Sequence, residues 1–292
     1  MKKALLILVI FLLSGVNSFA QNGFITEGLN IKSAILGKEM KYSVYLPFDY
    51  KTSNRNYPIL YLLHGLGDDD SGWVQFGEIG FYADKAIANG ETTPMVIIMP
   101  DGLRSFYINS ADGNLKYEDY FLKELMPAVE NLYRIRKTRD YRAIAGLSMG
   151  GYGAFNYALK HPELFCAAAP LSAAIFTNEE MENLDDKAYA DLGAVIYGSG
   201  LKAGNRVQAN NQQNSTLKLI DSKSPESLKS VRWFIDCGDD DFLINGNMAV
   251  HSAFREKNIP HQFKVRSGAH NWTYWRTAMP DVLRFLGDTF HK

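Results

Sequence analysis

One short stretch, residues 141–153, constrains the fold of this chain more than any other. Its apolar beginning predicts a strand, and the residues after Ser148 predict a helix. Ser148 lies at the turn between them, in the pattern Gly146-x-Ser148-x-Gly150, which has the spacing of a nucleophile elbow. A strand that runs directly into a helix strains the backbone at the corner, and flanking glycines have no Cβ to collide there. The stretch therefore predicts a serine whose hydroxyl is presented for reaction.

The rest of the chain alternates between apolar runs and helical patterns. Nearly continuous apolar runs of this kind are typical of strands that are buried on both faces of a parallel sheet. Two strands are expected within residues 24–46, and further strands are expected at 57–63, 95–99, 142–145, 165–171, 232–237 and 261–265. Helical patterns lie at 117–133, 149–159, 248–257 and 272–290. This order predicts an α/β fold with a mostly parallel central sheet and helices on both faces.

The first twenty residues have the pattern of a signal peptide. Lys2 and Lys3 give a positive start, an apolar run follows, and the small residues Ser18 and Ala20 stand at the two positions that a signal peptidase reads. The apolar run is too short to span a bilayer comfortably. We therefore expect export to the periplasm or the cell exterior, with cleavage near Ala20 and no integral membrane association.

Residues 21–292 are expected to form one large domain. Within it, residues 176–230 are polar, lie between two strands, and are too long for a simple crossover. They are interpreted either as an excursion near the substrate or as a surface insertion without function. The formal net charge is −1, and removal of Lys2 and Lys3 would make it −3. Such a balance gives no indication of a nucleic-acid surface.

The only two cysteines are expected to be buried free thiols. Cys166 begins one apolar run and Cys237 ends another. If these runs are neighbouring parallel strands, about 16 Å separates the two residues, which is far beyond the reach of a disulfide.

A serine nucleophile needs a base, and the base needs an acid behind it. In a doubly wound sheet both come from loops at the carboxyl ends of strands. His270 follows the strand at 261–265 and precedes the last helix, so it is the best of the six histidines for the base. His64 also ends a strand, but the glycines directly after it indicate another role.

Three consecutive aspartates are candidates for the acid. Asp239, Asp240 and Asp241 follow the strand at 232–237, and spacing alone does not choose among them. A metal site is the rival interpretation, but Phe242 follows instead of further oxygen ligands. The order serine, aspartate, histidine is that of α/β-hydrolases.

Stabilisation of an oxyanion requires two convergent backbone N–H groups. The first is expected from Met149, directly after Ser148. The second is expected from Leu66, in the glycine-containing loop after His64. The aspartates at 68–70 beside this loop are interpreted as solvated residues and not as a metal site.

Several motifs together carry a resemblance to a known family. In chain order they are His64-Gly-Leu-Gly67 with Trp73, Pro100-Asp-Gly102, Tyr117-Glu-Asp-Tyr120, Gly146-Leu-Ser-Met-Gly-Gly151, Cys237-Gly-x-x-Asp241 and Gly268-x-His270-x-Trp272. Over about residues 30–290 the chain resembles the putative-esterase (esterase D-like) family of α/β-hydrolases, which includes feruloyl and acetylxylan esterases and mycolyltransferases. The resemblance implies Asp241 as the acid and supports Ser148 and His270.

The resemblance implies a serine carboxylesterase that needs no cofactor or metal, and the signal-peptide pattern predicts that it is secreted. Its expected substrates are small or polysaccharide esters, with feruloyl or acetyl groups of the plant wall as the nearest match. Tyr107, Trp272 and Trp275 are candidates to line the substrate site, although tryptophans at helical spacing also suit a core. The alternatives are an acyltransferase of the mycolyltransferase type and a non-catalytic binding protein on the same fold. The sequence gives no indication of the oligomeric state.

Overall fold

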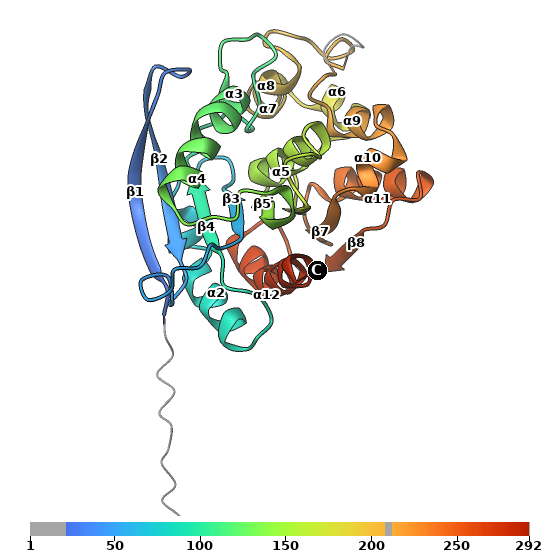
Figure 1. Cartoon of the computed structure of the whole chain (residues 1–292). Helices are drawn as coiled ribbons and strands as arrows, with labels where there is room; N and C mark the ends of the chain where they lie inside the picture. Colours follow the sequence, from blue (N-terminus) through green and yellow to red (C-terminus); the bar gives the residue numbers. More distant parts are fainter. Residues whose placement is uncertain (1–21, 208–211, 292) are drawn as a thin grey trace, which may run out of the picture.

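The computed structural model of the protein describes residues 22–207 and 212–291. The signal peptide expected at residues 1–20 lies outside the described residues. Figure 1 shows a central sheet with helices packed on both sides of it. This is the α/β arrangement that the alternation of apolar runs and helical patterns predicts.

Eight strands form one sheet in the order β1-β2-β4-β3-β5-β6-β7-β8. In chain order they are β1 (Phe24–Ser33), β2 (Lys38–Leu46), β3 (Ile59–Leu63), β4 (Val96–Pro100), β5 (Arg142–Leu147), β6 (Ala167–Leu171), β7 (Arg232–Gly238) and β8 (Gln262–Arg266). The pairs β1–β2 and β2–β4 are antiparallel. All the other pairs are parallel. The carboxyl ends of β3 to β8 therefore meet at one edge of the sheet.

The helices divide between the two faces of the sheet (Figure 1). Helices α2 (Ile79–Ala88) and α12 (Trp272–Phe290) cover one face. The other face is covered by α3 (Tyr117–Tyr120), α4 (Met126–Leu132), α5 (Met149–Lys160), α9 (Thr216–Ser222), α10 (Pro225–Lys229) and α11 (Ile244–Glu256). The short helix α1 (Gly72–Gln75) follows the loop after β3.

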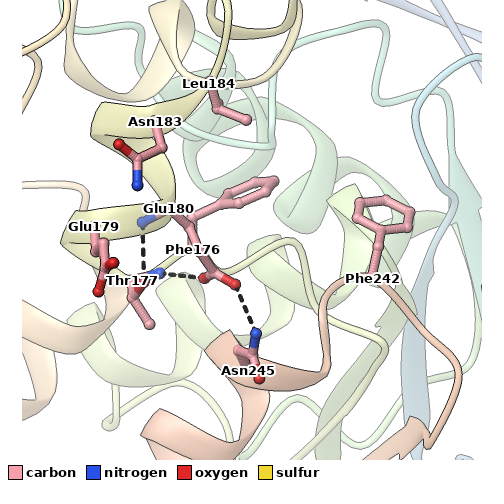
Figure 2. Close-up of a pocket in the computed structure, with 8 residues that line it drawn as sticks. All are labelled: Phe176, Thr177, Glu179, Glu180, Asn183, Leu184, Phe242 and Asn245. Carbon is pink, nitrogen blue, oxygen red and sulfur yellow. Dashed lines mark hydrogen bonds between the residues drawn. The ribbon is translucent and has the colours of Figure 1, made fainter.

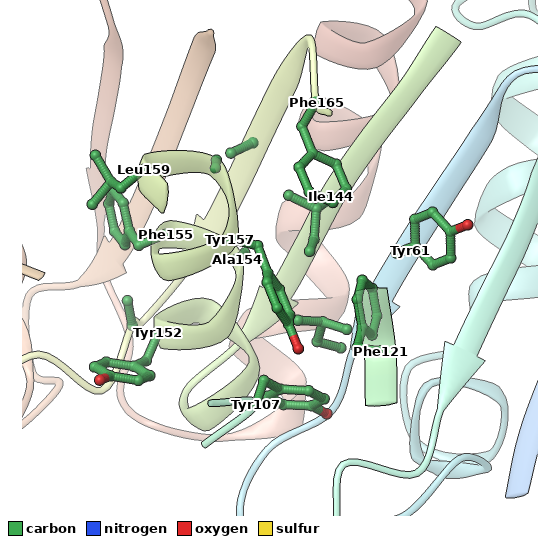
Figure 3. Packing of buried hydrophobic residues seen from close by; sticks show 14 of the residues in the cluster. Tyr61, Tyr107, Phe121, Ile144, Tyr152, Ala154, Phe155, Tyr157, Leu159 and Phe165 are labelled. Atoms are coloured by element: carbon green, nitrogen blue, oxygen red, sulfur yellow. The ribbon is translucent and has the colours of Figure 1, made fainter. Parts of the chain in front are cut away.

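The central strands are buried on both faces, because a separate hydrophobic cluster covers each face of the sheet. In β3, Ile59, Tyr61 and Leu63 face the cluster under α5, whereas Leu60 and Leu62 face the cluster under α12. Figure 3 shows the first cluster, in which the ring of Phe121 lies between those of Tyr61 and Tyr157. The rings of Phe121 and Tyr157 are stacked with their centroids 4.5 Å apart. This two-sided burial explains why the strands read as continuous apolar runs.

The helix predicted at 117–133 is interrupted. Helices α3 and α4 are joined by a π-helical turn, Phe121–Leu125, in which the N–H of Met126 donates to the carbonyl of Phe121. Pro127 follows, and proline has no N–H to bond to the carbonyl four residues earlier, with which its ring would also clash. Helix α4 begins directly after the π-helical turn, so Pro127 lies in its first turn, where the missing N–H is tolerated.

The long segment between β6 and β7 contains short helices. They are α6 (Asn178–Asn183), α7 (Asp186–Leu192), α8 (Ala194–Tyr197), α9 and α10. Thr177 and Glu180 form a capping box that fixes the start of α6, because each side chain accepts the other's backbone N–H. Among the residues that the structure describes, none of the helices is long and apolar enough to cross a membrane.

The two cysteines are free and buried, as predicted. Cys166 stands just before β6, and Cys237 lies near the end of β7, its parallel neighbour. Burial raises the pKa of the Cys166 thiol to about 11. Burial also raises the pKa of Cys237, and the nearby Asp241 carboxylate adds to the effect.

One ion pair is buried within the fold. Arg142, at the start of β5, donates to both oxygens of Glu130 on α4, at 2.7 and 2.9 Å. The two residues are 7% and 6% exposed. The hydroxyl of Tyr61 donates to the same carboxylate at 3.0 Å. The ion pair therefore links α4 to the central strand β5, and both carboxylate oxygens of Glu130 are hydrogen-bonded.

We expect Glu130→Ala to lower the free energy of unfolding by about 3–5 kcal/mol, because it leaves a buried guanidinium without its counter-ion. Urea unfolding followed by circular dichroism measures the change. Lys187→Ala is the matched control, since it removes an ion pair with Asp191 that lies at the surface. Equal unfolding midpoints for Glu130→Ala and the wild type would contradict the assigned role of the buried pair.

Candidate active site

Ser148 occupies a strained corner between β5 and α5. Its backbone has φ 54° and ψ −116°, and Met149 is already the first residue of the helix. Such a conformation is costly for a residue with a side chain and persists only where the surroundings hold it. A Cβ at Gly150 would lie 2.4 Å from the carbonyl oxygen of Leu63, so only glycine allows the backbones to approach this closely. The corner has the geometry that the Gly-x-Ser-x-Gly spacing predicts.

His270 and Asp241 meet Ser148 at the carboxyl edge of the sheet. The Oγ of Ser148 lies 2.9 Å from Nε2 of His270. On the other side of the ring, Nδ1 lies 3.0 and 2.9 Å from the two carboxylate oxygens of Asp241. A carboxylate can only accept, so Nδ1 carries the proton and Nε2 is free to accept the serine hydroxyl. Nucleophile, base and acid thus form one hydrogen-bonded chain.

The structure brings Asp241 to the histidine and leaves the other two aspartates outside. Asp241 is 2% exposed, whereas Asp239 and Asp240 are exposed. Burial would raise the pKa of Asp241, but hydrogen bonds from His270 and from the N–H of Leu243 outweigh burial and lower it below its usual value. The carboxyl is therefore ionised at neutral pH. Among the described residues, no group of three or more His, Cys, Asp or Glu side chains is placed to hold a metal ion.

The two backbone N–H groups expected to face an oxyanion belong to segments next to the serine. Met149 is the first residue of α5, where backbone N–H groups have no partner within the helix. The loop that carries Leu66 passes close to Ser148, since a Cβ at Gly65 would lie 3.6 Å from the serine Cβ. The arrangement can therefore direct two donors, and the positive end of a helix, at a carbonyl bound over Ser148.

His64 holds this loop in place. Its Nε2 accepts the N–H of Gly102 at 2.7 Å, so Nδ1 carries the proton and donates to the carbonyl of Gly65, also at 2.7 Å. The hydroxyl of Tyr107 donates to the carbonyl of His64 at 3.1 Å. His64 is 1% exposed and does not reach the reaction centre. It connects the loop after β3 to the loop after β4.

Two of the three aromatic candidates for substrate contact, Tyr107 and Trp275, are buried in this structure. Tyr107 is 0% exposed and lies beneath the active-site loops, and Trp275 is 5% exposed. Each of the two side chains fills space in the interior and donates a hydrogen bond there, Tyr107 to the carbonyl of His64 and Trp275 to the hydroxyl of Ser172. Trp272 is different, because it is only half-buried, in contact with the rings of Trp73 and Phe76.

Trp275 and Ser172 contact the catalytic pair His270 and Asp241. The sequence did not indicate this supporting role. The rings of Trp275 and His270 pack perpendicular to each other, with their centroids 4.8 Å apart. Its indole N–H donates to the hydroxyl of Ser172 at 3.0 Å. A hydrogen bond from that hydroxyl also lowers the pKa of Asp241. Ser172 follows β6 with a positive φ of 42°, a conformation that no sequence pattern marked.

Comparison with known proteins gives consistent results. The family described as "Putative esterase" matches residues 33–286. An esterase of Mycobacterium tuberculosis is 30% identical over 271 residues, which cover 87% of this chain and 56% of the relative. The chain thus spans about half the length of that curated relative.

Solved structures show the same likeness. A ferulic acid esterase superposes with a TM-score of 0.78 at 32% identity, covering 92% of this chain and 99% of its own. A fluorophosphonate-binding serine hydrolase of Staphylococcus aureus superposes with a TM-score of 0.75 at 28% identity, covering 91% and 98%. With the matching family, these likenesses show that the chain has the α/β-hydrolase fold and belongs to the putative-esterase family.

Proposed function

We propose that this protein is a serine carboxylesterase that hydrolyses acyl esters, with feruloyl or acetyl esters of plant-wall polysaccharide as its substrate class. The observation that carries the proposal is the hydrogen-bonded chain from Ser148 through His270 to Asp241. The likeness to a ferulic acid esterase supports the feruloyl part of the substrate class.

The geometry supports a two-step acyl-enzyme mechanism. Ser148 Oγ attacks the ester carbonyl while Nε2 of His270 takes the hydroxyl proton, and the carboxylate of Asp241 stabilises the imidazolium that forms. The N–H groups of Met149 and Leu66 stabilise the tetrahedral oxyanion. When the intermediate collapses, His270 gives the proton to the leaving alcohol. Water, deprotonated by His270, then attacks the acyl-enzyme, and His270 returns that proton to Ser148 Oγ as the acid leaves.

Export is part of the proposal. The positive start, the apolar run and the small residues Ser18 and Ala20 support a cleaved signal peptide and a periplasmic or extracellular enzyme. Mass spectrometry of the protein purified from an expressing bacterium measures the mature N-terminus. A mature protein that starts at Gln21 is the expected result, and retention of residues 1–20 would contradict it.

A panel of esters tests the activity and the substrate class together. The purified protein is expected to release acid from p-nitrophenyl acetate, and from methyl ferulate or acetylated xylan, with Ser148→Ala as the control. Ferulate release that depends on Ser148 would support the feruloyl assignment, and acetyl release alone would restrict the class to acetyl esters. If no ester of the panel were hydrolysed in a Ser148-dependent way, the proposed function would be wrong.

A further inference from the structure

A pocket opens beside the proposed reaction centre, and no step of the mechanism uses it. Its walls come from the loop and helix after β6 and from the segment after β7 (Figure 2). The volume is about 560 Å³, within the range of about 300–1,000 Å³ that is usual for small-molecule sites. The side chains that matter for its chemistry are Phe176, Glu179, Glu180, Asn183, Phe242 and Asn245.

Phe242 joins this pocket to the catalytic histidine. It directly follows Asp241, and its ring centroid lies 4.7 Å from that of His270. The side chain is 61% exposed, which is unusual for a phenylalanine and leaves its face open to a ligand. A group bound in the pocket would therefore lie on the His270 side of Ser148.

The lining of the pocket suits an uncharged, hydroxylated ligand. Two glutamates and two asparagines supply hydrogen-bond acceptors and amide donors, and the rings of Phe176 and Phe242 supply apolar faces. None of the described residues that line the pocket is a lysine or arginine. Two carboxylates without a cation beside them would repel an anionic group. A neutral sugar ring, with hydroxyls at its edge and C–H groups on its faces, matches this lining.

The polar groups are partly fixed and partly free. Glu180 accepts the N–H of Thr177 at 2.8 Å and the amide of Asn245 at 3.1 Å, which orients its carboxylate (Figure 2). Within the described residues, the side chains of Glu179 and Asn183 make no hydrogen bond and are exposed on α6. These two side chains can bond to a ligand without first breaking a bond within the protein.

We propose that this pocket binds the alcohol part of the ester, as a neutral sugar residue. The inference rests on the proposed esterase function, because the leaving alcohol must take its proton from Nε2 of His270 and therefore departs next to that ring. Phe242 packs on His270 and also lines the pocket, so a sugar attached to the leaving oxygen enters the pocket directly. The acyl group then lies away from this pocket.

Two esters that share an acyl group and differ in their alcohol test the assignment. Methyl ferulate has no sugar, whereas feruloyl-arabinose carries one. If acetyl is the group released, p-nitrophenyl acetate and an acetylated methyl xyloside replace them. Asn183→Ala removes one amide from the pocket without changing its charge. We expect kcat/KM to fall about tenfold for the sugar ester, the effect of one lost hydrogen bond, and to stay unchanged for the simple ester.

Asn178→Ala is the matched control, because Asn178 lies on the same helix, is exposed, and is not part of the pocket lining. It should leave both esters unaffected. Labelling of Ser148 by a fluorophosphonate at the wild-type rate shows that each variant is folded. Equal effects of Asn183→Ala on both esters, or an effect on neither, would overturn the assignment of the pocket. If the wild-type protein hydrolysed none of these esters, the esterase function itself would fail, and the inference with it.

Discussion

Replacement of Ser148 by alanine should lower kcat by about five to six orders of magnitude, as in other enzymes of this mechanism. The reason is chemical, since the Oγ atom that lies 2.9 Å from His270 is the atom that would bond to the acyl group. Without it, His270 could only activate water directly. Initial rates on p-nitrophenyl acetate and on the preferred ester measure the loss.

The stability of this variant should be close to that of the wild type, because alanine keeps the Cβ at the corner and the backbone bonds there remain. Matching thermal unfolding midpoints therefore separate a loss of chemistry from a loss of fold. A fluorophosphonate should add its mass to the wild-type peptide that contains Ser148 and to no peptide of the variant. Retention of most of the wild-type turnover by Ser148→Ala would refute the assignment of the nucleophile.

The second large effect is expected from Asp241→Asn, which should lower kcat by about 10⁴-fold. The carboxylate accepts from Nδ1 of His270 with both of its oxygens. An asparagine turns an N–H₂ group toward the ring, so the proton moves to Nε2 and the lone pair needed by Ser148 is lost. The shape of the side chain is preserved, so the fold should be little affected.

Asp240→Asn provides the comparison. Asp240 is adjacent in sequence and is the same residue type, but it is exposed and lies outside the bonded chain. We expect wild-type rates on the same esters for this variant. Similar losses for the two substitutions would mean that the charge of the loop matters and not the bond to His270, which would contradict the assigned role of Asp241.

The sheet and the candidate site were predictable because their signals are local. Each of the central strands β3 to β6 shows its burial in an apolar run, and a residue between a strand and a helix is easily found when glycines flank it. His270 follows from its place after the last strand. Asp241 was only one of three aspartates by spacing, and its selection required the family resemblance.

The rest depends on contacts between distant segments. Tyr107 is an aromatic residue in a loop, which suits a binding role. Its side chain is nevertheless fully buried and packs against Gly102 and Gly153. Trp275 packs on a histidine five residues earlier and on Ser172, about a hundred residues away. The π-helical turn directly precedes the helix that contains Pro127, within a stretch whose pattern predicts one continuous helix. None of these outcomes is encoded in a periodicity.

The two buried thiols make the chain suitable for site-specific labelling. A maleimide or a spin label reacts with a thiolate, and both native thiols have raised pKa values and little access to solvent. A single cysteine placed at an exposed position such as Asn178, beside the pocket, would therefore be the one that reacts. Fluorescence or electron-spin measurements of ligand entry could then be made on the otherwise native sequence.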